Sequence, residues 1–203
     1  HALAFDWYCK GARAGDPESI FYYGWMNEAG KGTDKNPKEA ERWYRIGAES
    51  GNTVAQVRLG RLYLRGEGIP RNGTEAVRWL MAAVESGSTE AMMSLGTTYQ
   101  HGIGVIKNPD EGFRWFMRAA EAGSADGESM VAELLYSGDG VELNREEAAR
   151  WCQKAAERGH AFSQGMMGFL YTIGSGVPQN DDEAFKWSQM SALQGDSAGQ
   201  WML

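Results

Sequence analysis

Small and apolar residues recur along this chain at helical spacing, and the same pattern returns every 36 residues. In one stretch Ala40, Trp43 and Gly47 fall at positions i, i+3 and i+7, which predicts a single buried stripe on a helix. Gly51 then ends this helix by taking the left-handed conformation. A second helix is expected at once, and its buried stripe comprises Ala55, Leu59, Leu62 and Tyr63.

The recurrence covers the whole sequence without insertion or deletion. Six of the eight tryptophans follow it, and each is expected in the core: Trp7, Trp43, Trp79, Trp115, Trp151 and Trp187. Each unit is therefore predicted to contain a helix, a one-residue break, a second helix and a loop of about seven residues.

Asparagine and glutamate mark the start of the first helix of each unit. The spacing Asn-x-x-Glu predicts a capping box, in which the asparagine accepts from a backbone N–H and the glutamate reaches back to the N–H of the cap. The asparagines are Asn36, Asn72, Asn108, Asn144 and Asn180. Good caps for the second helices are Asp16, Asn52, Ser88, Ser124 and Asp196. His160 is expected to cap its helix poorly.

A small residue recurs in the middle of the second helix, where glycine is unfavourable by about 1 kcal/mol relative to alanine. The positions are Gly24, Gly60, Gly96, Ala132 and Gly168. We expect a neighbouring helix to pack closely against them. Each second helix ends in a Gly-x-Gly loop, such as 66–68, and five copies in one phase between helices indicate a structural turn rather than a phosphate site.

One helix pair cannot bury both of its faces, so the units must stack. The sequence predicts an all-α solenoid, a single array over 1–203 with about five and a half repeats. The boundaries are a partial repeat 1–15, then 16–51, 52–87, 88–123, 124–159 and 160–195, and a partial repeat 196–203. Because neither end carries a polar capping repeat, the chain is expected to be a segment of a longer protein.

The unit that spans residues 55–87 resembles the Sel-one-like repeat, a relative of the tetratricopeptide repeat. The matching pattern is Ala-Gln-x-x-Leu-Gly-x-x-Tyr followed by Gly-x-Gly-Ile and Asn-x-x-Glu-Ala-x-x-Trp. The resemblance implies an α/α right-handed superhelix and a role as adaptor or scaffold. Because many members belong to the bacterial envelope, it also implies a periplasmic or secreted location. Some members join each repeat by a disulfide, and this sequence lacks those cysteine pairs.

Composition and charge narrow the choice of function. The net charge of −7 argues against nucleic acid as a partner, and no apolar run is long enough to insert into a membrane. Cys9 and Cys152 lie about four repeats apart, too far for a disulfide within the chain. The three histidines share no helical turn, and the carboxylates recur with the repeat instead of forming an isolated pair. We therefore expect no enzyme, no cofactor and no metal.

Specificity in a repeat protein is expected at positions that differ between repeats. In the tetratricopeptide relatives the helix after the glycine stop lines the concave surface, which here places Val54, Val57, Arg61, Leu64 and Arg65 on the inward face. Exposed aromatic side chains such as Trp25, Phe162 and Phe169 are typical interface anchors. The candidate partner-binding residues are Trp25, Val57, Arg61, Met93, Thr97, Glu133, Phe162 and Phe169.

The leading hypothesis is a scaffold that binds a protein or peptide on this concave face, which is expected to offer acidic and apolar subsites. One alternative is a structural spacer or a segment that forms homo-oligomers through exposed solenoid ends, where Trp25 and Phe162 would pack against a neighbour. A second alternative, suggested by the tryptophans, is binding of polysaccharide or peptidoglycan in the cell envelope.

Overall fold

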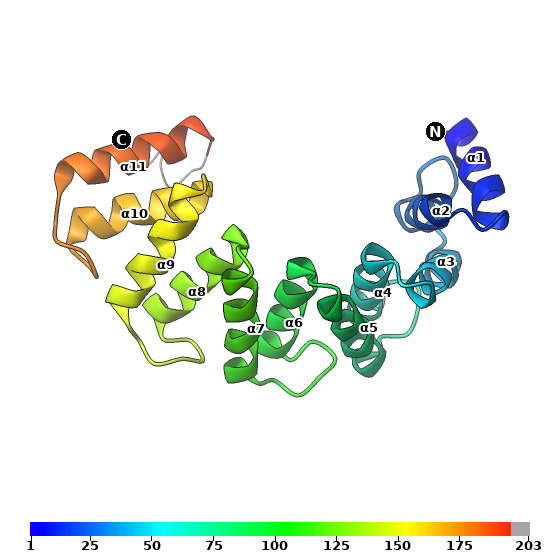
Figure 1. Cartoon of the computed structure of the whole chain (residues 1–203), viewed down its shortest axis with the longest axis horizontal. Coiled ribbons are helices and arrows are strands. Elements are labelled where there is room, and N and C mark those ends of the chain that lie inside the picture. The colour runs from blue at the N-terminus through cyan, green and yellow to red at the C-terminus, as the bar shows by residue number, and fades with distance from the viewer. Residues whose placement is uncertain (196–203) are drawn as a thin grey trace. The chain divides into compact units, whose positions relative to one another are not determined.

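The computed structural model describes residues 1–195, and these residues form helices and no strand (Figure 1). Every helix from α2 onward is 13 residues long, as an exact sequence repeat requires. The helices are α1 (Ala2–Arg13), α2 (Pro17–Ala29), α3 (Pro37–Glu49), α4 (Thr53–Arg65), α5 (Gly73–Glu85), α6 (Thr89–His101), α7 (Pro109–Glu121), α8 (Ala125–Ser137), α9 (Arg145–Glu157), α10 (Ala161–Ile173) and α11 (Asp181–Leu193). The predicted all-α repeat class is confirmed. Asp196 and the predicted partial repeat 196–203 lie outside the described residues.

The chain divides into two compact units, which we describe separately. Unit 1 comprises residues 1–98 and 102–106, with α1 to α5 and most of α6. Unit 2 comprises residues 99–101 and 107 onward, with α7 to α11. The second helices of the repeats, α2, α4, α8 and α10, each lie between two neighbours in the chain. Each packs more extensively on the helix that follows it than on the helix that precedes it.

The asparagine caps form as predicted. The prediction that the glutamate accepts from the backbone N–H of the cap residue is wrong. Asn72 Oδ1 accepts from the Glu75 N–H at 3.1 Å, and the other four asparagines do the same. The Asn72 N–H instead donates to the carbonyl of Tyr63 in the preceding helix at 3.1 Å. The glutamate is thereby free to accept from the indole of the repeat tryptophan, as Glu75 does from Trp79 Nε1 at 3.2 Å. The cap therefore also attaches the loop to the previous helix.

His160 is a better cap than the sequence suggested. Its Nδ1 accepts from the Ser163 N–H at 3.3 Å and lies 2.9 Å from Ser163 Oγ. An unprotonated ring nitrogen can replace the oxygen of a serine or asparagine side chain in this role. The expectation of a poor cap was therefore wrong.

Glycines close the helices where a positive φ is required. Gly51, which follows α3, has φ +83°. The Asn52 N–H donates to the carbonyl of Gly47, so a backbone acceptor in the last turn of that helix is paired. In the loop after α4, Gly66 and Gly68 have φ +66° and +75°. The prediction that these glycines serve the turn itself is confirmed by this geometry.

The small residues of the second helices allow close helix contact, as predicted. A Cβ on Gly60 of α4 would lie 2.8 Å from Leu80 Cγ of α5. A Cβ on Gly168 of α10 would lie 2.3 Å from Ser188 Oγ of α11. Both distances are shorter than packed atoms tolerate, so side chains are excluded at these positions.

The repeat tryptophans form much of the core, with two departures from the prediction. Buried rings belong to Trp43, Trp79, Trp115 and Trp187. Trp151 is half-buried, and Trp7 is 73% exposed. The ring of Trp43 packs edge-on against Tyr23 of the preceding second helix, with centroids 5.3 Å apart. The described residues supply no such helix before α1, which explains the exposure of Trp7.

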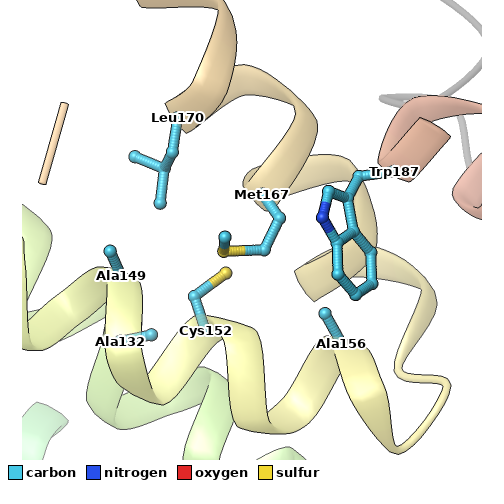
Figure 2. Close-up of a cluster of buried hydrophobic side chains, with 7 residues drawn as sticks. All are labelled: Ala132, Ala149, Cys152, Ala156, Met167, Leu170 and Trp187. Carbon is cyan, nitrogen blue, oxygen red and sulfur yellow. The ribbon is translucent and has the colours of Figure 1, made fainter. Parts of the chain in front are cut away.

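Unit 2 illustrates the core between three successive helices (Figure 2). Cys152 of α9 points toward Met167 of α10, and Trp187 of α11 lies beside them. The Cys152 thiol donates to the Ser163 carbonyl at 3.3 Å, and burial raises its pKa to about 12. A thiol with so high a pKa is a packing residue rather than a nucleophile.

Candidate functional site

Three of the predicted partner-binding residues meet in one pocket of unit 1. Arg61 of α4 and Met93 and Thr97 of α6 line a pocket with a volume of about 530 Å³. The other lining residues are Leu64, Arg65, Glu67, Arg71, Ser94, Thr98 and Ile103. We call this site the α4–α6 pocket. It lies between two successive second helices, where the sequence placed the variable face.

Hydrogen bonds fix Arg61 within this pocket. Its Nε donates to Ser94 Oγ at 2.9 Å, and its Nη1 pairs with Glu90 at the start of α6. The Ser94 hydroxyl in turn donates to the Glu90 carbonyl at 2.8 Å. A guanidinium carries five N–H donors, so these two contacts leave further donors of Arg61, including those of Nη2, for a ligand.

A second set of contacts fixes Arg65 at the end of α4. Its guanidinium pairs with Glu28 of α2, which also accepts from the Tyr44 hydroxyl at 2.7 Å. Burial and the neighbouring Glu28 carboxylate raise the pKa of Tyr44 far above its ordinary value. The phenol therefore stays neutral and keeps donating to Glu28, which holds the carboxylate in place for Arg65.

Val57 cannot serve as a contact residue, and the prediction for it is wrong. Its side chain is only 1% exposed, and it belongs to the core of unit 1. A step of three residues leaves Val57 about 60° around the helix from Val54, so the two share a face only roughly, and Val54 itself is 48% exposed. Trp25 of α2 is half-buried and is not among the residues that line the α4–α6 pocket.

The remaining predicted residues belong to unit 2. Glu133 of α8 is exposed, and Phe162 and Phe169 of α10 are 45% and 39% exposed. The Phe169 ring meets the Tyr136 ring edge-on, with centroids 6.5 Å apart. These side chains give unit 2 an acidic and aromatic surface, which differs from the arginine-lined pocket of unit 1.

Sequence reasoning missed several lining residues of the α4–α6 pocket. Glu67 and Ile103 are the middle residues of two Gly-x-Gly loops, and their counterparts in the other loops are Lys31, Asp139 and Ser175. Arg71 lies in the loop after α4, where other repeats have Lys35, Lys107, Leu143 and Gln179. A signal was present, because the middle residue of the Gly-x-Gly loop differs in every repeat, although the Arg71 position is basic in three repeats of five.

Two other hollows recur with the repeat and are therefore features of packing. One in unit 1, of about 490 Å³, includes Gly15 and Trp43. One in unit 2, of about 640 Å³, includes Gly123 and Trp151, the same repeat positions. A feature that returns in phase with the scaffold does not by itself mark a specific site.

The described residues contain no group of three His, Cys, Asp or Glu side chains that could hold a metal ion. Over the same residues, none of the helices combines the length and hydrophobicity needed to cross a bilayer.

A model of the Sel1 repeat matches residues 1–16, 17–52, 53–88, 89–124, 125–160 and 161–196. The fold is similar to that of a protective antigen of uropathogenic Escherichia coli strains that displays an SLR fold, with a TM-score of 0.84, 34% identity and coverage of 97% of this chain. It is also similar to a Sel1 repeat protein from Oxalobacter formigenes, with a TM-score of 0.84, 29% identity and coverage of 98%.

The chain spans 42% of the first of these relatives and 58% of the second. Cysteine rich protein B of Helicobacter pylori shares the fold at 20% identity, with a TM-score of 0.51 and coverage of 64% of this chain and 93% of that one. No curated protein matches the sequence.

Proposed function

Because the chain belongs to the Sel1 repeat family, whose members generally mediate protein–protein interactions, we propose that it is a non-enzymatic module that binds a protein or peptide on the face of its second helices. The observation that carries the proposal is the α4–α6 pocket. It is lined by side chains that differ from repeat to repeat, and it combines apolar surface with oriented donors. Apolar lining with a few placed polar groups is typical of ligand-binding pockets.

The alternative of a spacer or self-associating segment has one specific observation in its favour. Leu3 and Trp7 of α1 are 78% and 73% exposed, which leaves an apolar helix face uncovered. In the next repeat the corresponding tryptophan, Trp43, packs on the preceding second helix, so this face of α1 could receive either another repeat or another chain. Binding of polysaccharide has less support, because most repeat tryptophans are buried and unavailable for stacking on sugar rings.

The proposal is tested by panning a random twelve-residue peptide library on the purified chain, with sedimentation analysis of the same sample. We expect a defined set of peptides to be enriched and the chain to remain monomeric. The variant Arg61→Ala/Met93→Ala should reduce binding of these peptides at least about tenfold, since contact residues of this type contribute 1 kcal/mol or more.

The matched control is Arg78→Ala/Met81→Ala, which removes the same two residue types from the exposed surface of α5. It should bind like the parent chain. Equal helicity of both variants by circular dichroism excludes unfolding as the cause. Self-association without any enriched peptide would favour the spacer and contradict the proposed function.

A further inference from the structure

Basic residues are distributed unevenly among the second helices. Helix α4 carries Arg58, Arg61 and Arg65, and it carries no acidic residue. The other second helices, α2, α6, α8 and α10, contain no lysine or arginine at all. The arginines of α4 therefore depart from the repeat and serve no requirement that the other second helices share.

One basic position of the first helices α3, α5 and α7 follows the repeat. Arg42, Arg78 and Arg114 recur with the repeat, and each pairs with the glutamate three residues before it at 3.4–3.6 Å. These are exposed pairs within one helix, and they are worth little to stability. Because these arginines recur at the same repeat position, they belong to the solvent-exposed surface of the scaffold.

The charges that line the α4–α6 pocket are mainly positive. Arg61, Arg65 and Arg71 line it, and Glu67 is the acidic residue among the lining side chains. The partners of Arg61 and Arg65, Glu90 and Glu28, are not among the lining residues. Each guanidinium has more N–H donors than these contacts use, so donors remain on two side chains that line the pocket.

Apolar surface adjoins these donors. Leu64 of α4, Met93 of α6 and Ile103 of the following loop line the same pocket, and Met93 is only half-buried. An occupant must therefore offer an apolar group next to negative charge. A guanidinium binds a carboxylate by two parallel hydrogen bonds, which suits an acidic side chain or a chain terminus.

Resting on the proposed function, we infer that the α4–α6 pocket selects a peptide segment in which Asp or Glu residues flank an aliphatic or methionine side chain. The carboxylates bind Arg61, Arg65 and Arg71, and the apolar side chain contacts Leu64, Met93 and Ile103. A long polyanion fits less well. Unit 1 contains twelve acidic and twelve basic residues, so it has no net positive charge to favour a polyanion.

The test pans the same twelve-residue library in parallel on three proteins: the parent chain, Arg61→Gln/Arg65→Gln/Arg71→Gln, and the control Arg42→Gln/Arg78→Gln/Arg114→Gln. The two variants lose the same charge. We expect the parent and the control to enrich Asp and Glu at least twofold over the input library, and the pocket variant to lose that enrichment.

Arg61 and Arg65 also connect α4 to α6 and α2, so their replacement can destabilise the fold. A second variant therefore changes only Arg71. Arg71 has no ion pair among the described residues, so Arg71→Glu should leave the fold intact. It should shift the selected peptides from acidic toward basic composition. A synthetic acidic peptide from the parent selection should bind at least tenfold more tightly than the same peptide with Gln in place of each Glu and Asn in place of each Asp.

The outcomes separate the two proposals. Peptides that bind but are no more acidic than the input overturn this inference and leave the proposed function standing. Acidic peptides that all variants select equally also overturn it. Absence of any enriched peptide contradicts the proposed function itself. A fluorescent twenty-nucleotide DNA that binds more tightly than the selected peptide would show a polyanion site and overturn the inference as well.

Discussion

Units 1 and 2 are built from the same repeat but differ in charge. Unit 1 contains twelve Lys and Arg against twelve Asp and Glu, whereas unit 2 contains eight against fifteen. The whole net charge of −7 therefore belongs to unit 2. The scaffold does not require this difference, because both units use the same caps, glycine breaks and tryptophans.

Part of this charge difference lies on the second helices and their loops, and a similar part lies on the first helices, mainly on α11 with Asp181, Asp182 and Glu183. Unit 1 presents Arg61 and Met93 in a pocket, while unit 2 presents Glu133 and Phe169 on its surface. Positions that recur maintain packing, and positions that vary are free to acquire binding chemistry. Substitutions at recurring positions should therefore have equal effects in both units, and the following experiments examine that expectation.

The largest effect is expected from removing a buried repeat tryptophan in either unit. Trp79→Ala in unit 1 and Trp187→Ala in unit 2 should each lower the free energy of unfolding by about 3–5 kcal/mol, because each leaves a cavity in the core. Urea unfolding followed by far-ultraviolet circular dichroism measures the loss.

The matched control is Trp7→Ala, which changes the same repeat position on an exposed surface. It should change the free energy of unfolding by less than about 1 kcal/mol, as expected for a surface substitution. A loss at Trp187 much smaller than at Trp79 would mean that the two units do not share one packing scheme.

A smaller loss is expected from filling the close helix contact. Gly60→Val and Gly168→Val should each destabilise by about 1–3 kcal/mol, because a side chain would overlap Leu80 or Ser188. Thermal unfolding of both variants gives the comparison. Gln153→Val, at an exposed position of α9, controls for the low helix propensity of valine. Tolerance at either glycine would contradict the close contact in that unit.

The sequence predicted the scaffold well because its signals are local and repeated. The 36-residue step located the helices, the asparagine caps and the tight glycine contacts, and the structure confirms them. The exposure of Trp7 was missed for a physical reason. Burial depends on a neighbouring helix, and the repeat position alone does not show whether that helix is present.

The candidate site was only partly predictable. Spacing on α4 identified Arg61 but also assigned Val57, which is buried against other helices. The contribution of Arg71 and Ile103 depends on loops that join helices of different repeats, and helical periodicity does not describe loops. The sequence indicated which positions vary, while the structure was needed to bring them together.

The smallest effect is expected from removing the hydrogen bond of one asparagine cap in each unit. Asn72→Ala in unit 1 and Asn144→Ala in unit 2 should each destabilise by about 1 kcal/mol, because each leaves a first-turn N–H unpaired. The backbone N–H of the residue remains, so the loop stays attached to the preceding helix through Tyr63 or Leu135. Serine at either position should restore most of the loss, since Ser88 and Ser124 already cap helices of this chain. A loss well above about 2 kcal/mol, beyond the range for a cap alone, would show that the side chain also holds the loop.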